Sequence, residues 1–267
     1  MKHTVRVRLS RAGSPLLALL FPDDCRLCGV PLKEFSRIPV CGSCLNEPEA
    51  FAPEYFCSCC RTPFLNPAPL DDSGVCRLCR MGVSRFDAVY SYGSYDGALK
   101  GLIQLFKYDG VRPLAKPLGA WLAQALPRDQ KFDALVPMPL HWRRHFGRGF
   151  NQAALLAKEL SKRTGLPVKS VVTRRKSTEK QALLTRAQRR LNVSGAFKVP
   201  DAEAVRGMRV LLIDDVFTTG ATLNACAGAM KRAGAAHVSA LTLARVDRRP
   251  QFDFNREQFN RGHFNRD

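Results

Sequence analysis

Acidic residues are scarce in this chain. Its 267 residues include 23 Asp and Glu against 42 Lys and Arg, a formal net charge of +19. An excess of this size predicts an anionic partner, such as nucleic acid, a phosphorylated small molecule or a membrane surface. The excess is concentrated in residues 141–190, where fourteen Lys and Arg face only Glu159 and Glu179, a net of +12. We therefore expect one strongly basic stretch.

Long apolar runs are also missing. No stretch approaches about eighteen consecutive apolar residues, so we expect no transmembrane helix. The N-terminus, MKHTVRVRLSRAGSPLLALLF, places basic residues before an apolar run, as a secretory signal does. That run is short, and no small-x-small cleavage site follows it. We expect residues 16–21 to form a short helix on the protein itself, and a cytoplasmic location.

Cysteines, in contrast, are plentiful and regularly spaced. Eight of the ten form Cys-x-x-Cys pairs, and each such pair turns the chain so that both thiolates face one tetrahedral site. The intervals between pairs are typical of zinc ribbons. The spacing predicts two structural Zn²⁺ sites without an open position for water, because four thiolates fill each site. The predicted ligands are Cys25, Cys28, Cys41, Cys44, Cys57, Cys60, Cys76 and Cys79.

The spacing does not decide which two Cys-x-x-Cys pairs bind the same metal ion. Sequential pairing is the simplest arrangement, but interleaved pairing fits as well, and Cys59 offers a second partner for Cys57. A disulfide framework is disfavoured in a reducing cytosol. The segment is dense in Pro and Gly, and we expect it to need its metal to fold, since such binding typically contributes on the order of 10 kcal/mol. Cys226 stands alone in a helical pattern and is expected in the core.

From Phe86 onward, short apolar strands alternate with helical patterns. This alternation predicts an α/β domain with a parallel sheet covered on both faces. FDAVYSYGSY is expected to form a strand pair that bends at Gly93. We expect three parts: residues 1–85 with the double zinc ribbon, 86–247 as the α/β domain, and 248–267 as a disordered tail. The expected helices are 98–106, 114–126, 152–163 and 221–232; the expected strands are 134–137, 168–173, 210–213 and 237–244.

The stretch VLLIDDVFTTGATL, residues 210–223, carries the clearest chemical signal. In parallel sheets, ligands bind beyond the carboxyl ends of the strands, where Asp214 and Asp215 are expected. The turn that follows leads into a helix whose first N–H groups have no internal partner and favour an anion. Gly220 permits close approach, and Thr218, Thr219 and Thr222 add hydroxyl donors. The pattern predicts a phosphate cradle beside two carboxylates, which suits the hydroxyls of a phosphorylated ribose.

Two other nucleotide-binding motifs are absent. A Walker B strand requires a partner Gly-x-x-x-x-Gly-Lys-Ser/Thr loop, and a dinucleotide site requires Gly-x-Gly-x-x-Gly; the chain contains neither. An ordinary surface turn rich in Thr and Gly is a further alternative, but it would not require an acidic pair at the end of a buried strand.

The motif resembles the phosphoribosyl-pyrophosphate (PRPP) motif of type I phosphoribosyltransferases. Together with VPMPLHWRRHFGRGFNQAALLA (136–157), QALLTRAQRRLNVSGAF (181–197) and the cysteine pairs, the chain resembles the ComF family of competence-associated proteins from about residue 16 to residue 245. The resemblance implies that Asp214 and Asp215 hold ribose hydroxyls and that PRPP binds with Mg²⁺. It implies that the 5′-phosphate is bound by Thr218, Thr219, Gly220, Ala221 and Thr222.

The resemblance also implies two loops over this site. Residues 138–148 would form the pyrophosphate loop, in which Arg143, Arg144 and Arg148 can offer charge-assisted hydrogen bonds to pyrophosphate or DNA. Residues 174–196 would form a mobile loop that closes over the ligand. No acceptor-binding element is recognisable.

Two functions remain open. The ComF resemblance favours a protein that binds PRPP and single-stranded DNA during DNA uptake, with competence or DNA-processing proteins as further partners. The alternative is an active phosphoribosyltransferase that uses a base or another nitrogen acceptor. The basic stretch exceeds what one PRPP needs and suits a DNA groove, with Trp142, Phe146 and Phe150 available for stacking. The same aromatic residues would otherwise belong to the core, beneath a solvated basic face.

Overall fold

The fold was determined as a computed structural model, which describes residues 23–32, 36–64, 66–82, 84–140, 149–174 and 195–246. The expected N-terminal helix at 16–21 and the expected disordered tail lie outside these residues. Within them, no helix is long and apolar enough to cross a membrane.

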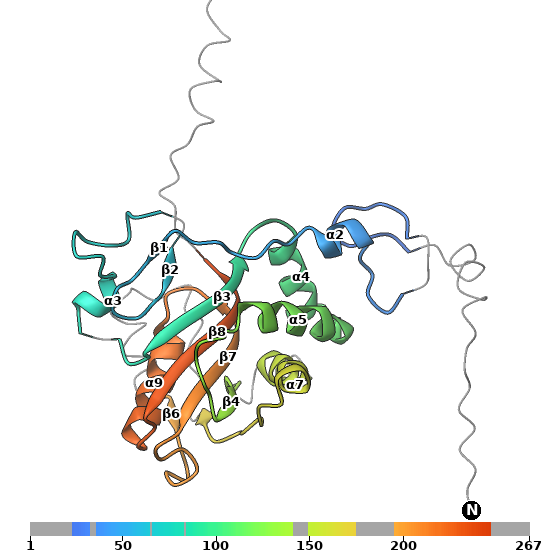
Figure 1. The fold of residues 1–267 in the computed structure, drawn as a ribbon. Coiled ribbons are helices and arrows are strands. Elements are labelled where there is room, and N and C mark those ends of the chain that lie inside the picture. Colours follow the sequence, from blue (N-terminus) through green and yellow to red (C-terminus); the bar gives the residue numbers. More distant parts are fainter. Residues whose placement is uncertain are drawn as a thin grey trace, which may run out of the picture.

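A four-stranded parallel sheet forms the centre of the molecule (Figure 1). Its order is β3-β8-β7-β4, and every neighbouring pair is parallel, as predicted. The two central strands are buried along most of their length, because helices and the cysteine-rich segment cover both faces. The strands are β3 (Ala88–Ser94), β4 (Ala134–Pro137), β7 (Arg209–Phe217) and β8 (His237–Arg245).

The helices divide between the two faces of the sheet. One face packs against three helices that share a core with Leu211, Ile213 and Leu241. The other packs against α9 (Ala221–Arg232), whose core includes Leu212 and Cys226. The three helices on the first face are α4 (Gly97–Lys107), α5 (Ala115–Ala125) and α7 (Gln152–Thr164), with the 3₁₀ turn η2 (Arg112–Leu114) leading into α5.

Three predicted strands differ from the structure. The predicted strand pair around Gly93 is a single strand, β3, because its residues pair in parallel with β8 through Gly93 itself. The predicted strand at 168–173 is absent over residues 168–172, where Val168 makes an isolated bridge to Leu135. Only Thr173 lies in a strand, β5 (Thr173–Arg174), which pairs antiparallel with β6 (Phe197–Lys198). Strand β7 continues to Phe217, so both aspartates lie within it rather than beyond its end.

The cysteine-rich segment packs directly on the sheet and its helices. Near its start, Leu27 lies so close to α4 that a Cβ on Gly101 would be 2.5 Å from Leu27 Cδ2. Further along, the Val89 N–H of β3 donates to the Cys60 carbonyl over 3.2 Å. The Cys-x-x-Cys pairs therefore contribute buried residues to both cores of the sheet. The segment contains α2 (Gly42–Asn46), β1 (Tyr55–Phe56), β2 (Pro63–Phe64) and α3 (Arg77–Arg80).

Candidate functional site

Two cysteine tetrads lie in the cysteine-rich segment, and their pairing is sequential. Within each tetrad the four Sγ atoms lie within 4.8 Å of one another. All ten cysteines are free thiols, which excludes the disulfide alternative in this structure. Cys59 is exposed and belongs to neither group, and Cys226 is buried as predicted. The first tetrad is Cys25, Cys28, Cys41 and Cys44; the second is Cys57, Cys60, Cys76 and Cys79.

In each tetrad the surroundings lower the pKa of one thiol, Cys25 in the first and Cys76 in the second. The Cys41 N–H donates to Cys25 Sγ and the Cys76 N–H donates to Cys57 Sγ, each over 3.3 Å. A hydrogen bond with the Cys60 thiol lowers the pKa of Cys76 to about 5, against the effect of burial. Four sulfur ligands without a carboxylate or water suit a soft, tetrahedral metal ion with a structural role.

The two aspartates of β7 lie on opposite faces of the sheet, because side chains alternate along a strand. Asp215 faces α4, whereas Asp214 faces α9, where its charge raises the pKa of the Cys226 thiol in addition to the larger effect of burial. The Asp215 N–H donates to Asp214 Oδ1 over 2.9 Å. The two carboxylates are therefore adjacent in the chain but differ in their surroundings.

Lys107, the last residue of α4, binds Asp215. Its Nζ lies 2.9 Å from both Oδ1 and Oδ2, and the side chains are only 19% and 10% exposed. Burial acts to lower the pKa of Lys107, but the charge of Asp215 raises it above its ordinary value. Gln152, the first residue of α7, donates from Nε2 to the Lys107 carbonyl over 3.3 Å. This lysine could not be predicted from the sequence, because a single basic residue at the end of a helix does not indicate a binding site.

Among the described residues, no cation is in direct contact with Asp214. Burial, and then the neighbouring charge of Asp215, raise the pKa of Asp214 to about 7, although the residue keeps part of its surface exposed. The charges of Lys107 and Arg174 act in the opposite direction. Asp214 therefore changes its charge near neutral pH.

The turn between β7 and α9 presents backbone N–H groups. Gly220 caps the helix with a φ of 71°, in the left-handed region that favours glycine. Within the described chain, no carbonyl accepts from the N–H groups of residues 218–223; the Ala221 N–H reaches only Thr219 Oγ1, at 3.5 Å. A Cβ on Gly220 would lie 2.9 Å from the Phe217 ring and 3.4 Å from Leu78. The turn is thus tightly packed against Phe217 and Leu78, and its N–H groups donate to no carbonyl of the described chain.

Both ends of the expected pyrophosphate loop lie at the same edge of the sheet. Met138 follows β4, its N–H donates to the Ile213 carbonyl, and its own carbonyl accepts from Asn151 Nδ2. Gly149 accepts from Arg112 over 3.3 Å. The predicted ligands Arg143, Arg144 and Arg148 lie outside the described residues, as do 175–194 of the expected mobile loop.

The expected stacking aromatics are only partly described. Trp142 and Phe146 lie outside the described residues. Phe150 is 7% exposed and packs against Phe106, with ring centroids 5.7 Å apart, while Arg112 covers its ring. The prediction that Phe150 stacks on a base is therefore wrong, because the side chain belongs to the core.

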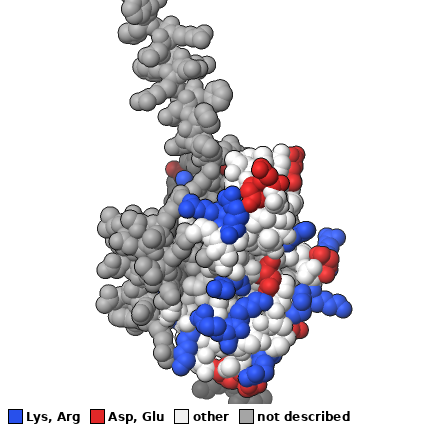
Figure 2. Space-filling model, turned by 90° about the vertical axis from the view of Figure 1, so that its left-hand side faces the viewer, with Lys and Arg blue, Asp and Glu red and all other residues white. Residues whose placement is uncertain are grey.

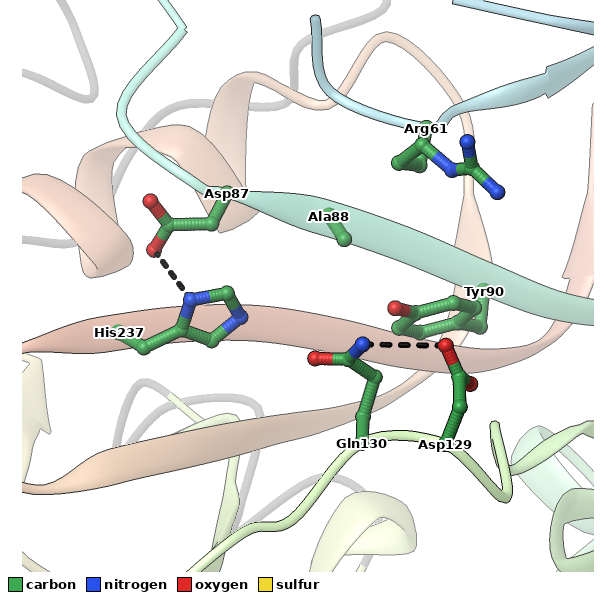
Figure 3. Close-up of a pocket in the computed structure, with 7 residues that line it drawn as sticks. All are labelled: Arg61, Asp87, Ala88, Tyr90, Asp129, Gln130 and His237. Carbon is green, nitrogen blue, oxygen red and sulfur yellow. Dashed lines mark hydrogen bonds and ion pairs between the residues drawn. The ribbon is translucent and has the colours of Figure 1, made fainter.

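A shallow pocket lies at the opposite edge of the sheet, near the starts of β3 and β8 (Figure 3). Its polar groups are largely engaged with one another. Asp87 binds Lys231 at 2.7 Å and His237 at 3.6 Å, and Gln130 donates to Asp129. The pocket is therefore separate from the aspartates and the turn. Its lining residues are Arg61, Asp87, Ala88, Tyr90, Asp129, Gln130 and His237.

Comparisons with known proteins agree with this arrangement. Residues 148–257 match the phosphoribosyl transferase domain family. The chain is 30% identical to "Competence protein F" of Haemophilus influenzae, covering 82% of this chain and 90% of that protein. It is 32% identical to "Competence protein ComFC" of Bacillus subtilis, over 86% and 88% of the two chains.

Two further similarities are more distant. "DNA utilization protein YhgH" of Escherichia coli K12 is 29% identical, over 85% of this chain and 99% of that protein. Among solved structures, glutamine PRPP amidotransferase from B. subtilis matches with a TM-score of 0.37 and 20% identity, over 52% of this chain and 30% of that chain. The extent of the match to the two competence proteins shows that this chain belongs to the ComF family, with a parallel-sheet phosphoribosyltransferase-like fold preceded by two cysteine tetrads.

Proposed function

We propose that the chain binds PRPP with Mg²⁺ at the turn after β7, binds single-stranded DNA through basic side chains, and acts in DNA uptake. The observation that carries the PRPP proposal is the row of N–H groups at residues 218–223 without a carbonyl acceptor in the described chain. Such groups at the start of a helix favour a phosphate. The hydroxyls of Thr218, Thr219 and Thr222 add donors to the same anion.

The carboxylates next to the turn suit the ribose part of PRPP. Asp214 can accept from a ribose hydroxyl, since only its Oδ1 is engaged by the Asp215 N–H among the described residues. Asp215 is different, because Lys107 occupies both of its oxygens. A ribose hydroxyl or a Mg²⁺ ion at Asp215 would have to share these oxygens with the ammonium group, or displace it. In this proposal, Asp214 is the first contact of the ribose and Asp215 is the second.

The proposed metal of the tetrads is Zn²⁺, one ion in each. Each tetrad offers four sulfur atoms and no other ligand type, which is the donor set of closed structural zinc sites. The ions stabilise the fold and take no part in reactions at the turn.

The DNA proposal rests on charge. Lys and Arg outnumber Asp and Glu on the face seen in Figure 2. Three exposed arginines have no described carboxylate within 4.0 Å. They are Arg77 on α3, Arg85 just before β3, and Arg232 at the end of α9. Arg85 and Arg232 lie side by side, since atoms of both approach to 3.4 Å of a Cβ built on Gly228. Unneutralised guanidinium groups of this kind suit the phosphates of a strand.

Calorimetric titration with PRPP and Mg²⁺ tests the ligand. We expect the double variant Asp214→Asn, Asp215→Asn to lose measurable PRPP binding, because two acceptors for ribose hydroxyls and Mg²⁺ become amides. Asp201→Asn, an exposed acid elsewhere, serves as the matched control and should bind as the parent does. Metal content should be unchanged in all three proteins. Equal PRPP affinity in the double variant would rule out this binding site.

Transferase activity is the second candidate, and the match of residues 148–257 to the phosphoribosyl transferase domain family supports it. Release of pyrophosphate from PRPP in the presence of a panel of bases measures it directly. PRPP binding without release across the panel favours the binding function.

A further inference from the structure

An exposed tyrosine stands at the end of α4. The side chains of Leu99, Leu102, Ile103, Leu105 and Phe106 satisfy the apolar face of this helix in the core. Tyr108, which follows Lys107, is 65% exposed and is the most exposed large hydrophobic residue in the described chain. Its ring therefore contributes little to the core, and its position calls for another explanation.

The ring lies beside the proposed ribose site. Lys107 Nζ is 6.0 Å from the Tyr108 ring centroid and 2.9 Å from both oxygens of Asp215. One ammonium group is thus close to both the ring and the carboxylate. A second tyrosine, Tyr95, follows β3 at the same edge. Burial is the main cause of its raised pKa; Tyr108 and Asp215 raise the pKa further, and the charge of Lys107 lowers it.

The backbone holds this position by specific hydrogen bonds. The Tyr108 N–H donates to the Gln104 carbonyl over 2.8 Å, and the Lys107 carbonyl accepts from Gln152. The Arg112 N–H donates to the Gly110 carbonyl over 2.7 Å, and Gly110 has a φ of 67°. Because these hydrogen bonds fix the segment after α4, a ligand that binds the Tyr108 ring would not have to order a flexible segment first.

We propose that the Tyr108 ring is a stacking surface for a planar heteroaromatic group, namely a nucleobase joined to, or accepting, the phosphoribosyl group at Asp214 and the turn. This inference rests on the proposed PRPP site and adds to it the base-binding element that the sequence did not reveal. An aromatic face binds any base, and the Lys107 ammonium beside it can donate to ring nitrogen or carbonyl acceptors of the base. The phosphate and ribose would be bound at the turn, and the base would extend over Tyr108.

Two ligands that share the ribose 5-phosphate group test the inference, each titrated by calorimetry: ribose 5-phosphate, with a hydroxyl at the anomeric carbon, and AMP, with adenine in its place. With the parent protein we expect AMP to bind about tenfold more tightly, as one base stacked on an aromatic side chain provides. Tyr108→Ser should bring this ratio close to one and leave the affinity for ribose 5-phosphate unchanged. Tyr108→Phe should preserve the ratio, because the ring remains. Phe56→Ser, at another exposed aromatic, is the matched control and should preserve it too.

The possible failures are distinguishable. If ribose 5-phosphate binds but AMP binds no more tightly, or if the ratio survives in Tyr108→Ser, the stacking role of Tyr108 is overturned and the ribose-phosphate site stands. If neither ligand binds and PRPP does not bind either, the proposed function fails, and the inference fails with it.

Discussion

Asp214 and Asp215 show how two identical neighbours acquire different properties. Asp215 is paired with Lys107 in a mostly buried ion pair, whereas Asp214 is partly buried and contacts no cation in the described part of the chain. The charge of Asp215 adds to the effect of burial in raising the pKa of Asp214. The ribose site is therefore expected to carry one acidic group that switches near neutral pH.

The raised pKa of Asp214 predicts a pH dependence of stability. Its pKa is about 7 in the folded chain against an ordinary value of 3.8. As pH rises from about 4 to 7, the unfolded chain releases this proton first, so the free energy of unfolding falls across that window. The slope for one proton is at most about 1.4 kcal/mol per pH unit.

Urea unfolding of the parent and of Asp214→Asn between pH 5 and 8 measures this effect. The parent should lose stability relative to the variant as pH rises to about 7, and the difference should then stay constant. Comparison with the variant cancels the protonation of the cysteine thiolates, which both proteins share. Parallel curves over the whole range would contradict the assignment of this titration to Asp214.

At the scale of the elements, the second tetrad supports the turn that carries the proposed phosphate site. Leu78, between Cys76 and Cys79, packs behind Gly220, and Phe86 meets Phe217 edge to face at 6.2 Å. The Arg85 N–H donates to Asn224 Oδ1 of α9 over 2.6 Å. The first tetrad supports α4 in the same way, through Leu27. Each cysteine tetrad thus lies behind one half of the candidate site.

Loss of one metal should therefore affect one half of the site. In Cys79→Ser we expect the metal content to fall by one equivalent, faster hydrogen exchange at residues 217–224, and PRPP affinity at least tenfold lower. In Cys28→Ser, we expect the same loss of metal but faster exchange in α4 instead. Hydrogen exchange with mass spectrometry resolves the two segments. Unchanged exchange at 217–224 after metal loss in Cys79→Ser would contradict the supporting role of the second tetrad.

The elements also show what local patterns can predict. The helical patterns at 98–106, 152–163 and 221–232 agree with α4, α7 and α9 to within one residue, because an amphipathic repeat is a property of the segment itself. The partners of a strand are not local. The alternation before Gly93 could not reveal parallel pairing with β8, and Lys107 meets Asp215 across 108 positions only because α4 packs on the sheet. The turn was found from sequence, but the cation beside it was not.

For the whole molecule, charge predicts a strong salt dependence of DNA binding. If six phosphates of a single strand are neutralised on binding, raising the salt from 50 to 200 mM should lower the affinity by roughly 300-fold, because binding releases counter-ions. Fluorescence anisotropy with a labelled oligonucleotide measures this slope. The triple variant Arg77→Gln, Arg85→Gln, Arg232→Gln should bind more weakly and with a shallower slope.

Arg37→Gln, at an exposed position near the first tetrad, is the control and should leave the slope unchanged. A flat salt response in the parent protein, or no binding at low salt, would exclude DNA binding through these charges.

The strand order has a consequence for how the chain is made. Strand β8, the last of the described strands to leave the ribosome, occupies the place between β3 and β7. Strand β3 emerges early and has no neighbour in the sheet until nearly all of the described chain has been synthesised, so its edge is open to wrong partners during that time. The eight cysteines of the tetrads all precede β3. A metal ion bound there early would hold Cys60 in the position where its carbonyl accepts from the Val89 N–H of β3.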